Sequence, residues 1–168
     1  MAKFTIYWNI MGTMINENTM RWHPEVKMFL KRDLKPMQNR NIAWSIQEDN
    51  QGVEDVTKLL TGYKDLFDDI RIGQGDVRQP KHYIPDLAGS PVVFIGCRPK
   101  FDIQAANKAD AITIRIKNPK YSKYAGEVPK SRWEYPLIEV TKIRSAIEVI
   151  RILSRKTKTT KGRVITIT

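Results

Sequence analysis

The chain has 168 residues, which is enough for one domain with a full hydrophobic core, and its single cysteine, Cys97, rules out an intrachain disulfide. Lysine and arginine number 29 against 18 aspartates and glutamates, and this net charge of +11 predicts a polyanionic partner, with nucleic acid ahead of an anionic membrane surface. Apolar runs of four or five residues exclude a transmembrane helix, and the absence of a signal-peptide pattern together with the lone cysteine predicts a cytoplasmic protein.

The first half of the chain alternates between strand and helix patterns. Three β-branched or aromatic runs predict strands, at residues 4–10, 41–46 and 69–72. Two segments with apolar residues at helical spacing predict helices, at residues 26–34 and 52–60. Pro36 and Gly62 follow these segments and predict their ends. A short helix or turn is expected at residues 81–87.

The second half is organised around residues 91–117. An apolar run at 92–95, a turn at Gly96, a helix opening near Pro99 and a β-branched run at 112–116 predict two buried parallel strands joined by a crossover helix. Residues 118–135 have no clear period and precede a short strand at 137–140. Thr141 is then expected to cap a C-terminal helix with apolar residues between 143 and 153.

This alternation of strands and helices predicts an α/β fold, Rossmann-like, with a mostly parallel sheet and helices on both faces. We expect one domain at residues 1–153, followed by a basic C-terminal tail at 154–168. The last residues, 164–168, could add an edge strand or stay disordered.

Four short segments resemble the motifs of the haloacid dehalogenase-like (HAD) hydrolases. Residues 95–109, Ile-Gly-Cys-Arg-Pro-Lys-Phe-Asp-Ile-Gln-Ala-Ala-Asn-Lys-Ala, resemble the fourth motif, Gly-Asp followed by Asp-Ile and a helix of small residues. Residues 8–15 resemble the first motif, Asp-x-Asp-Gly-Thr-Leu-Ile. Ser45 falls where the second-motif Ser or Thr would lie, and Gln79-Pro80 resembles the third-motif Lys-Pro. The resemblance implies a HAD fold, and the short spacing between the first two motifs implies that a substantial cap domain is absent.

In that family the chemistry is phosphoryl transfer through an aspartyl intermediate, assisted by Mg²⁺ and a lysine. The positions of the nucleophile, the acid/base, the lysine and the metal ligand hold neutral residues here, namely Asn9, Met11, Gln79 and Cys97. Three supporting positions keep residue types of the family, namely Thr13, Ser45 and Asp102. The resemblance therefore implies an inactive pseudoenzyme that has lost the Mg²⁺ site, needs no cofactor and has no small-molecule substrate.

Other catalytic and metal chemistries have weak support in the sequence. Cys97 lacks the Cys-x5-Arg loop of a thiol phosphatase, so we expect a small buried group rather than a nucleophile. His23 and His82 are not at ligand spacing from any other histidine or cysteine, so no metal site is predicted.

Two basic segments are predicted to bind RNA. The first mixes cations, which would contact phosphates, with rings that could stack on unpaired bases, and its candidates are Lys120, Tyr121, Lys123, Tyr124, Lys130 and Arg132, with Trp133 as a further ring. The second is the tail, which has five positive charges and no acid between 155 and 163, at Arg155, Lys156, Lys158, Lys161 and Arg163. The alternatives are a loop that packs its rings on the sheet edge and a solubilising tail. One helix face carries the cations Lys27, Lys31, Arg32 and Lys35. The sequence favours RNA contact and plain solvation of this face equally.

These observations lead to one principal hypothesis and two alternatives. The principal hypothesis is an inactive HAD-like protein that serves as a basic, RNA-binding structural component of a ribonucleoprotein. The ribosome is the leading case, with rRNA and neighbouring ribosomal proteins as partners and no membrane. The alternatives are a hydrolase of altered chemistry that acts on an anionic substrate through Cys97 or Asp102, and a protein-binding pseudoenzyme that regulates an active relative.

Overall fold

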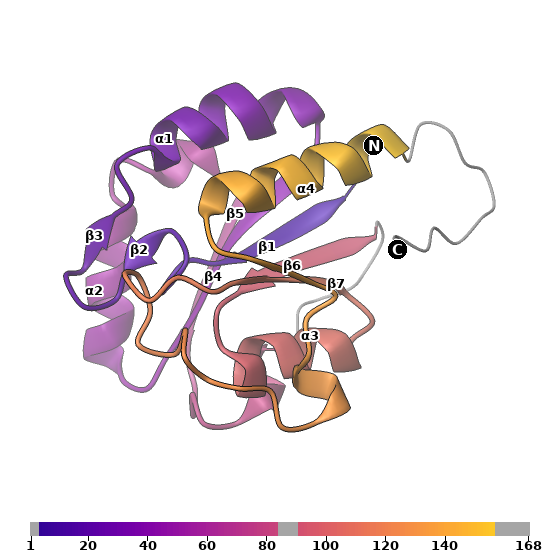
Figure 1. Ribbon diagram of the computed structural model, residues 1–168. Coiled ribbons are helices and arrows are strands. Elements are labelled where there is room, and N and C mark those ends of the chain that lie inside the picture. The colour runs from indigo at the N-terminus through magenta and orange to yellow at the C-terminus, as the bar shows by residue number, and fades with distance from the viewer. Residues whose placement is uncertain (1–3, 84–90, 157–168) are drawn as a thin grey trace.

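The computed structural model describes residues 4–83 and 91–156 (Figure 1). Its centre is a parallel sheet of six strands in the order β5-β4-β1-β6-β7-β8. The strands are β1 (Thr5–Asn9), β4 (Arg40–Gln47), β5 (Asp69–Gln74), β6 (Val92–Gly96), β7 (Ile112–Ile116) and β8 (Ile138–Val140). This arrangement confirms the predicted α/β fold with a mostly parallel sheet.

Helices cover both faces of this sheet (Figure 1). On one face, Ile6 and Trp8 of β1 pack in a cluster with residues of the first helical segment, of α2 (Asn50–Leu60) and of α4 (Ile143–Lys156). On the other face, Tyr7 of β1 packs in a cluster with Ala106 of α3 (Gln104–Lys108). Because both faces are covered, every residue of β1 is buried, as expected for a central parallel strand.

The first helical segment is longer than the sequence predicted, and its expected end is wrong. It runs from α1 (Val26–Met28) through the π-helix η1 (Phe29–Leu34) into the 3-10 turn η2 (Lys35–Met37). Pro36 lies inside η2 near its start, where a missing N–H costs little. The segment ends instead at Gln38, which adopts a left-handed conformation with φ of 60°.

The end of the chain also differs from prediction. Helix α4 begins at Ile143, two residues after Thr141, and it continues to Lys156. Arg155 and Lys156, which were assigned to the tail, are therefore helical. The remaining tail candidates and the suggested edge strand at 164–168 lie outside the described residues. The predicted turn at 81–87 is described only to Tyr83, where it ends η4 (Pro80–Tyr83).

A small hairpin, β2 (Ile15–Asn16) with β3 (Arg21–Trp22), follows β1 where no strand was predicted. Trp22 holds it against α2. Its ring stacks on Tyr63 with centroids 3.9 Å apart, and its indole N–H donates to the carbonyl of Leu59 at 2.7 Å. The hairpin therefore lies beside the carboxyl end of β1.

A buried arginine fixes the long connection that follows β7. The guanidinium of Arg115 donates to the carbonyls of Cys97, Tyr124, Ala125 and Glu127 at 2.9 to 3.3 Å. Backbone carbonyls from two separate segments thus converge on one side chain. No helix among residues 4–83 and 91–156 is long and apolar enough to cross a bilayer.

Candidate functional site

A hollow of about 470 Å³ lies at the carboxyl ends of β1 and β4. In open α/β sheets this is the edge at which ligands bind. Its wall includes Asn9, Met11, Ser45, Tyr83, Arg98 and Tyr124. Three positions that the motif spacing singled out, Asn9, Met11 and Ser45, are therefore brought together as predicted.

The turn after β1 sets the position of Asn9 and Met11. Gly12 has φ of 76°, a left-handed conformation that glycine adopts without strain. The Thr13 hydroxyl is buried and donates to the carbonyls of Asn9 and Ile10. A Cβ on Gly12 would lie 2.7 Å from the sulfur of Cys97, so this turn and the end of β6 are packed in direct contact.

Cys97 is buried and does not line the hollow. Its Sγ lies 3.7 Å from the carbonyl oxygen of Met11. Burial is the main cause that raises the pKa of the Cys97 thiol well above its ordinary value. The reactive thiolate is thus disfavoured, in keeping with a packing role.

Asp102 is also buried, and it caps the turn that leaves β6. Its Oδ2 accepts hydrogen bonds from the N–H groups of Cys97 and Arg98, both at 3.0 Å. Its Oδ1 accepts no hydrogen bond of ordinary geometry. Burial raises the pKa of Asp102, while the two N–H groups, the Arg98 charge and the Asn9 amide act in the opposite direction.

Gly96 is required by this arrangement. A Cβ at Gly96 would lie 2.6 Å from Cβ of Asp102, so the strand end and the capping carboxylate leave no room for a side chain. The motif-like spacing of Gly96 and Asp102 therefore corresponds to a close packing contact.

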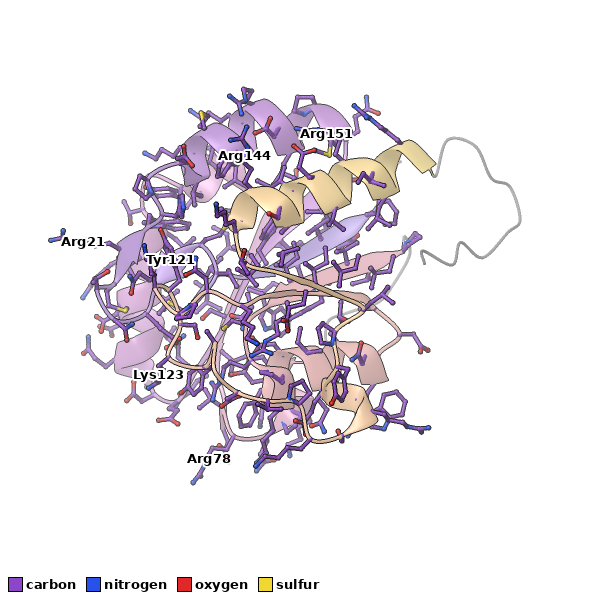
Figure 2. The ribbon with its side chains drawn as sticks, in the orientation of Figure 1. Arg21, Arg78, Tyr121, Lys123, Arg144 and Arg151 are labelled. Atoms are coloured by element: carbon purple, nitrogen blue, oxygen red, sulfur yellow. The ribbon has the colours of Figure 1, made fainter. Side chains whose placement is uncertain are left out.

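Gln79 does not line the hollow. Its side chain is exposed, and its amide donates to the carboxylate of Asp76 at 3.2 Å. Asp76 also binds Arg78, and these contacts lower the pKa of Asp76 to about 2. Arg78 points away from the body of the molecule (Figure 2).

Arg98 is one of the two cations that line the hollow, and the sequence reasoning missed it. Its guanidinium carbon lies 3.8 Å from the centre of the Tyr124 ring and 4.4 Å from that of Phe101. One terminal nitrogen is 3.5 Å from the Tyr83 hydroxyl, and burial raises the pKa of Tyr83. The only signal for this role was its place directly after Gly96-Cys97, at the end of a predicted strand.

Carboxylates outnumber cations around the hollow. Four acidic residues line it, namely Glu17, Glu48, Asp49 and Asp55. The cations are Arg98 and Lys123. A protein with a net charge of +11 thus has a local excess of negative charge at this edge, which disfavours a phosphate ligand.

The donor set at the family's metal position does not fit Mg²⁺. A hard cation prefers carboxylate oxygens, whereas this chain offers a carboxamide at Asn9 and a buried thiol at Cys97. No step of phosphoryl transfer can be derived from these residues.

The predicted basic and aromatic loop divides into two separate places. Residues 120–124 lie against the β2–β3 hairpin, where the backbone N–H of Lys123 donates to Glu17 at 3.0 Å (Figure 2). Tyr121 stacks on His23 with centroids 5.2 Å apart, and Tyr124 lies under Arg98. Residues 130–135 instead pack against α3 and η5 (Pro99–Ile103).

Four of the predicted phosphate contacts are solvent-exposed, namely Lys120, Lys123, Lys130 and Arg132. Tyr121 and Tyr124 are half-buried by the contacts just described. The predicted cations are thus available to a partner, whereas one face of each of these two rings is already occupied within the chain.

A second basic surface, the helical basic face, is formed by residues 29–37 and 142–155. The two segments lie side by side on the same layer of the fold (Figure 1). The cations of these two segments are Lys31, Arg32, Lys35, Lys142, Arg144, Arg151 and Arg155. Lys31 and Lys35 border a neighbouring hollow together with Asp65 and Asp68. The carboxylates of the two segments, Asp33 and Glu148, both bind Arg151. Lys27 is directed elsewhere, over the Tyr63 ring at 4.5 Å.

A groove of about 350 Å³ runs between the two segments of this face. Arg32, Arg151 and Arg155 line it together with Asp33. Arg144 and Arg151 both lie on the side of α4 toward η1 (Figure 2). Asp33 accepts hydrogen bonds from both Arg32 and Arg151, so it holds two guanidinium groups in place.

The strand order, the helices on both faces and a hollow at the carboxyl ends of the strands define an α/β protein of HAD-like fold. No family model and no curated protein matches the chain. An uncharacterised protein from Listeria monocytogenes serotype 4b is similar in structure, with a TM-score of 0.65 and 19% identity over 91% of this chain and 99% of that one.

The putative HAD-hydrolase YfnB from Bacillus subtilis, whose crystal structure is bound to magnesium, is also similar. It has a TM-score of 0.56 and 15% identity over 77% of this chain. The match spans 56% of the YfnB chain. At these identities the likeness shows a shared fold, and the activity of this chain has to be argued from its own residues.

Proposed function

We propose that this protein is a HAD-like pseudoenzyme that acts as a basic RNA-binding component of a ribonucleoprotein. The observation that carries the proposal is the distribution of charge. The hollow where the fold would bind a phosphate is rimmed by carboxylates, whereas cations gather on the helical basic face. The ribosome is the RNA-rich assembly in which we place it first, with rRNA and neighbouring proteins as partners.

The residues of the hollow argue against phosphoryl transfer. The carboxamide of Asn9 is a poor nucleophile, and the thioether of Met11 transfers no proton. Neither Cys97 nor Asp102 lines the hollow, so a hydrolase that used either group would need the turn after β1 to open. These observations favour the pseudoenzyme over the hydrolase alternative.

The helical basic face supports contact with a nucleic acid backbone. Arginine guanidinium groups bind phosphate through paired N–H donors. Arg155 is exposed beside the groove, whereas the paired donors of Arg32 already bind Asp33. Contacts with phosphate are independent of sequence and weaken steeply with salt. The protein is therefore expected to bind RNA through the backbone, with a strong dependence on ionic strength.

Fluorescence anisotropy with a labelled RNA hairpin at several salt concentrations tests this function. The variant Lys31→Gln/Lys35→Gln/Arg155→Gln removes three charges from the helical basic face. It should weaken binding and reduce the slope of log K against log salt by up to about 3, since each lost phosphate contact removes about 0.9.

A matched control removes three charges elsewhere, through Lys58→Gln/Lys64→Gln/Lys81→Gln, and should bind nearly as the wild type does. Equal losses in the two variants, or no binding by the wild type, would contradict the proposal. Salt-sensitive co-sedimentation with ribosomes tests the particular assembly. Mg²⁺-dependent phosphatase activity that is lost in Asp102→Asn would overturn the assignment as a pseudoenzyme.

A further inference from the structure

Four large apolar side chains are exposed on the segment that leads into β8. We call Val128, Trp133, Tyr135 and Leu137 the η6 platform, after the turn η6 (Arg132–Glu134) at its centre. Their exposed fractions are 72%, 36%, 58% and 68%. Several exposed apolar groups within ten residues of chain are typical of a contact surface rather than of scattered surface residues.

In this segment the aromatic rings are exposed and the carboxylate between them is buried, which is the reverse of the pattern that stability alone would favour. Between the exposed rings of Trp133 and Tyr135, the side chain of Glu134 is only 8% exposed. Its carboxylate accepts hydrogen bonds from the backbone N–H of Lys130 at 2.9 Å and the hydroxyl of Ser131 at 3.4 Å. A loop that folded only for its own stability would bury a ring and expose the carboxylate.

Polar side chains beneath the platform fix its backbone. The amide of Asn107 donates to the carbonyls of Trp133 and Tyr135 at 2.7 and 2.8 Å. The Thr113 hydroxyl donates to the side-chain oxygen Oδ1 of Asn107 at 2.9 Å and accepts from the backbone N–H of Leu137, also at 2.9 Å. The backbone that carries the rings is thus fixed before any partner arrives, which lowers the entropic cost of binding.

Cations accompany the rings. Lys130 and Arg132 are exposed within the same segment, and the Arg132 guanidinium carbon lies 4.6 Å from the centre of the Trp133 ring. Helical segments α3 and η5 pack against η6, and each carries an exposed lysine, Lys108 and Lys100. Exposed rings set among cations are the arrangement that binds unpaired bases and their phosphates.

We propose that the η6 platform stacks unpaired RNA bases on Trp133 and Tyr135, while Lys130 and Arg132 contact the phosphates that flank them. This inference rests on the proposed RNA-binding function and adds a single-stranded partner to it. It places base stacking on Trp133 and Tyr135 rather than on Tyr121 and Tyr124, because the first two rings are exposed whereas the latter two are half-buried.

The test compares oligouridylate with an RNA duplex of equal length in anisotropy titrations. Trp133→Ala and Tyr135→Ala should each weaken binding of the single strand by about 5- to 100-fold, the usual effect of losing one stacked base. Binding of the duplex through the helical basic face should change little. Trp133→Phe keeps an aromatic face and should retain most of the affinity for the single strand.

Tryptophan fluorescence gives an independent readout. Trp8 and Trp44 are buried, and Trp22 is stacked on Tyr63, so Trp133 is the tryptophan most accessible to a base. Oligouridylate should quench the emission of the wild type, and the quenching should be lost in Trp133→Phe.

The outcomes separate this inference from the function on which it rests. If Trp133→Ala binds single-stranded RNA as the wild type does, the platform is overturned while RNA binding stands. Equal losses for single strand and duplex would also overturn it, because stacking would not explain them. If the wild type binds neither RNA, both proposals fail.

Discussion

Arg115, buried on β7, donates a hydrogen bond to the carboxylate of Glu139 on β8 at 3.2 Å. Since the same guanidinium binds four backbone carbonyls, the pair joins the sheet edge to the long connection that carries the basic residues. Glu139 is partly exposed, so removing Arg115 costs mainly the hydrogen bonds to these backbone carbonyls, which are left unpaired.

Arg115→Met should therefore reduce the free energy of unfolding by about 3–5 kcal/mol, measured by urea denaturation. Lys117→Met is the matched control, because Lys117 meets the same carboxylate at 3.8 Å from an exposed position. An exposed pair contributes about 0–1 kcal/mol, so the control should lose little stability. Similar losses in the two variants would contradict the structural role of Arg115.

Two glycines with positive φ provide a test of the packing behind the hollow. Gly62 has φ of 82° and open space around it, whereas a Cβ at Gly12 would meet the Cys97 sulfur. Gly62→Ala should cost about 1–2 kcal/mol of backbone strain. Gly12→Ala should cost about 1–3 kcal/mol more, from overpacking.

A double-mutant cycle checks the cause of that additional loss. Adding Cys97→Ala to Gly12→Ala removes the clashing sulfur and should recover part of it, giving a favourable coupling energy by denaturation. The coupling between Cys97→Ala and Gly62→Ala should be near zero.

The pH dependence of stability should report the burial of Asp102. Because burial raises the pKa of Asp102 above 3.8, the folded carboxyl keeps its proton where the unfolded one has lost it. The stability that this group contributes is present below 3.8 and is lost as pH rises through the folded pKa. Relative to the wild type, Asp102→Asn should thus gain stability as pH rises above 3.8 through the folded pKa, measured by denaturation at a series of pH values.

Asp69 serves as a control, because its pKa is shifted in the opposite direction to that of Asp102. The hydrogen bond from Arg71 is the main cause that lowers the pKa of Asp69, so its contribution is present above 3.8 and is lost as pH falls through the folded pKa. Asp69→Asn should accordingly lose stability relative to the wild type as pH rises. A difference for Asp102→Asn that does not change with pH would show that burial does not govern this carboxyl.

Restoring two carboxylates should restore a response to Mg²⁺. Asn9→Asp/Cys97→Asp places two carboxylates near Asp102, so without metal the variant should melt below the wild type. Mg²⁺ at about ten times its Kd should then stabilise the variant by about 1.4 kcal/mol, seen as a rise in Tm. The control Asn9→Ala/Cys97→Ala should not respond. An equal rise in the wild type would contradict the proposal that this chain has no Mg²⁺ site.

The parts of the fold that the sequence predicted well are the β-branched runs. Residues 112–116 form β7 as expected, because β-branched residues that alternate with a period of two are typical of a strand. The β2–β3 hairpin could not be predicted, since its two-residue strands are too short for any periodicity and depend on Trp22 packing against Tyr63. Gln38 likewise gave no signal that it, rather than Pro36, would end the helical segment.

The sequence likewise predicted the positions of some residues of the candidate site and not of others. Motif spacing correctly brought Asn9, Met11 and Ser45 to one edge, because parallel strands end together. It did not place Gln79, whose position depends on a local bond to Asp76. The role of Arg115 was also not predictable, because its acceptors lie on segments that only the folded chain brings together.

The burial of Cys97 gives the protein an internal probe of its own opening. As the only thiol in the chain, it should react with a thiol reagent only when the turn after β1 separates from the end of β6. If that separation requires global unfolding, the labelling rate will follow the free energy of unfolding as urea is added. If the turn opens by itself, labelling will be faster and nearly independent of urea, and its rate will measure how often this turn separates from the end of β6.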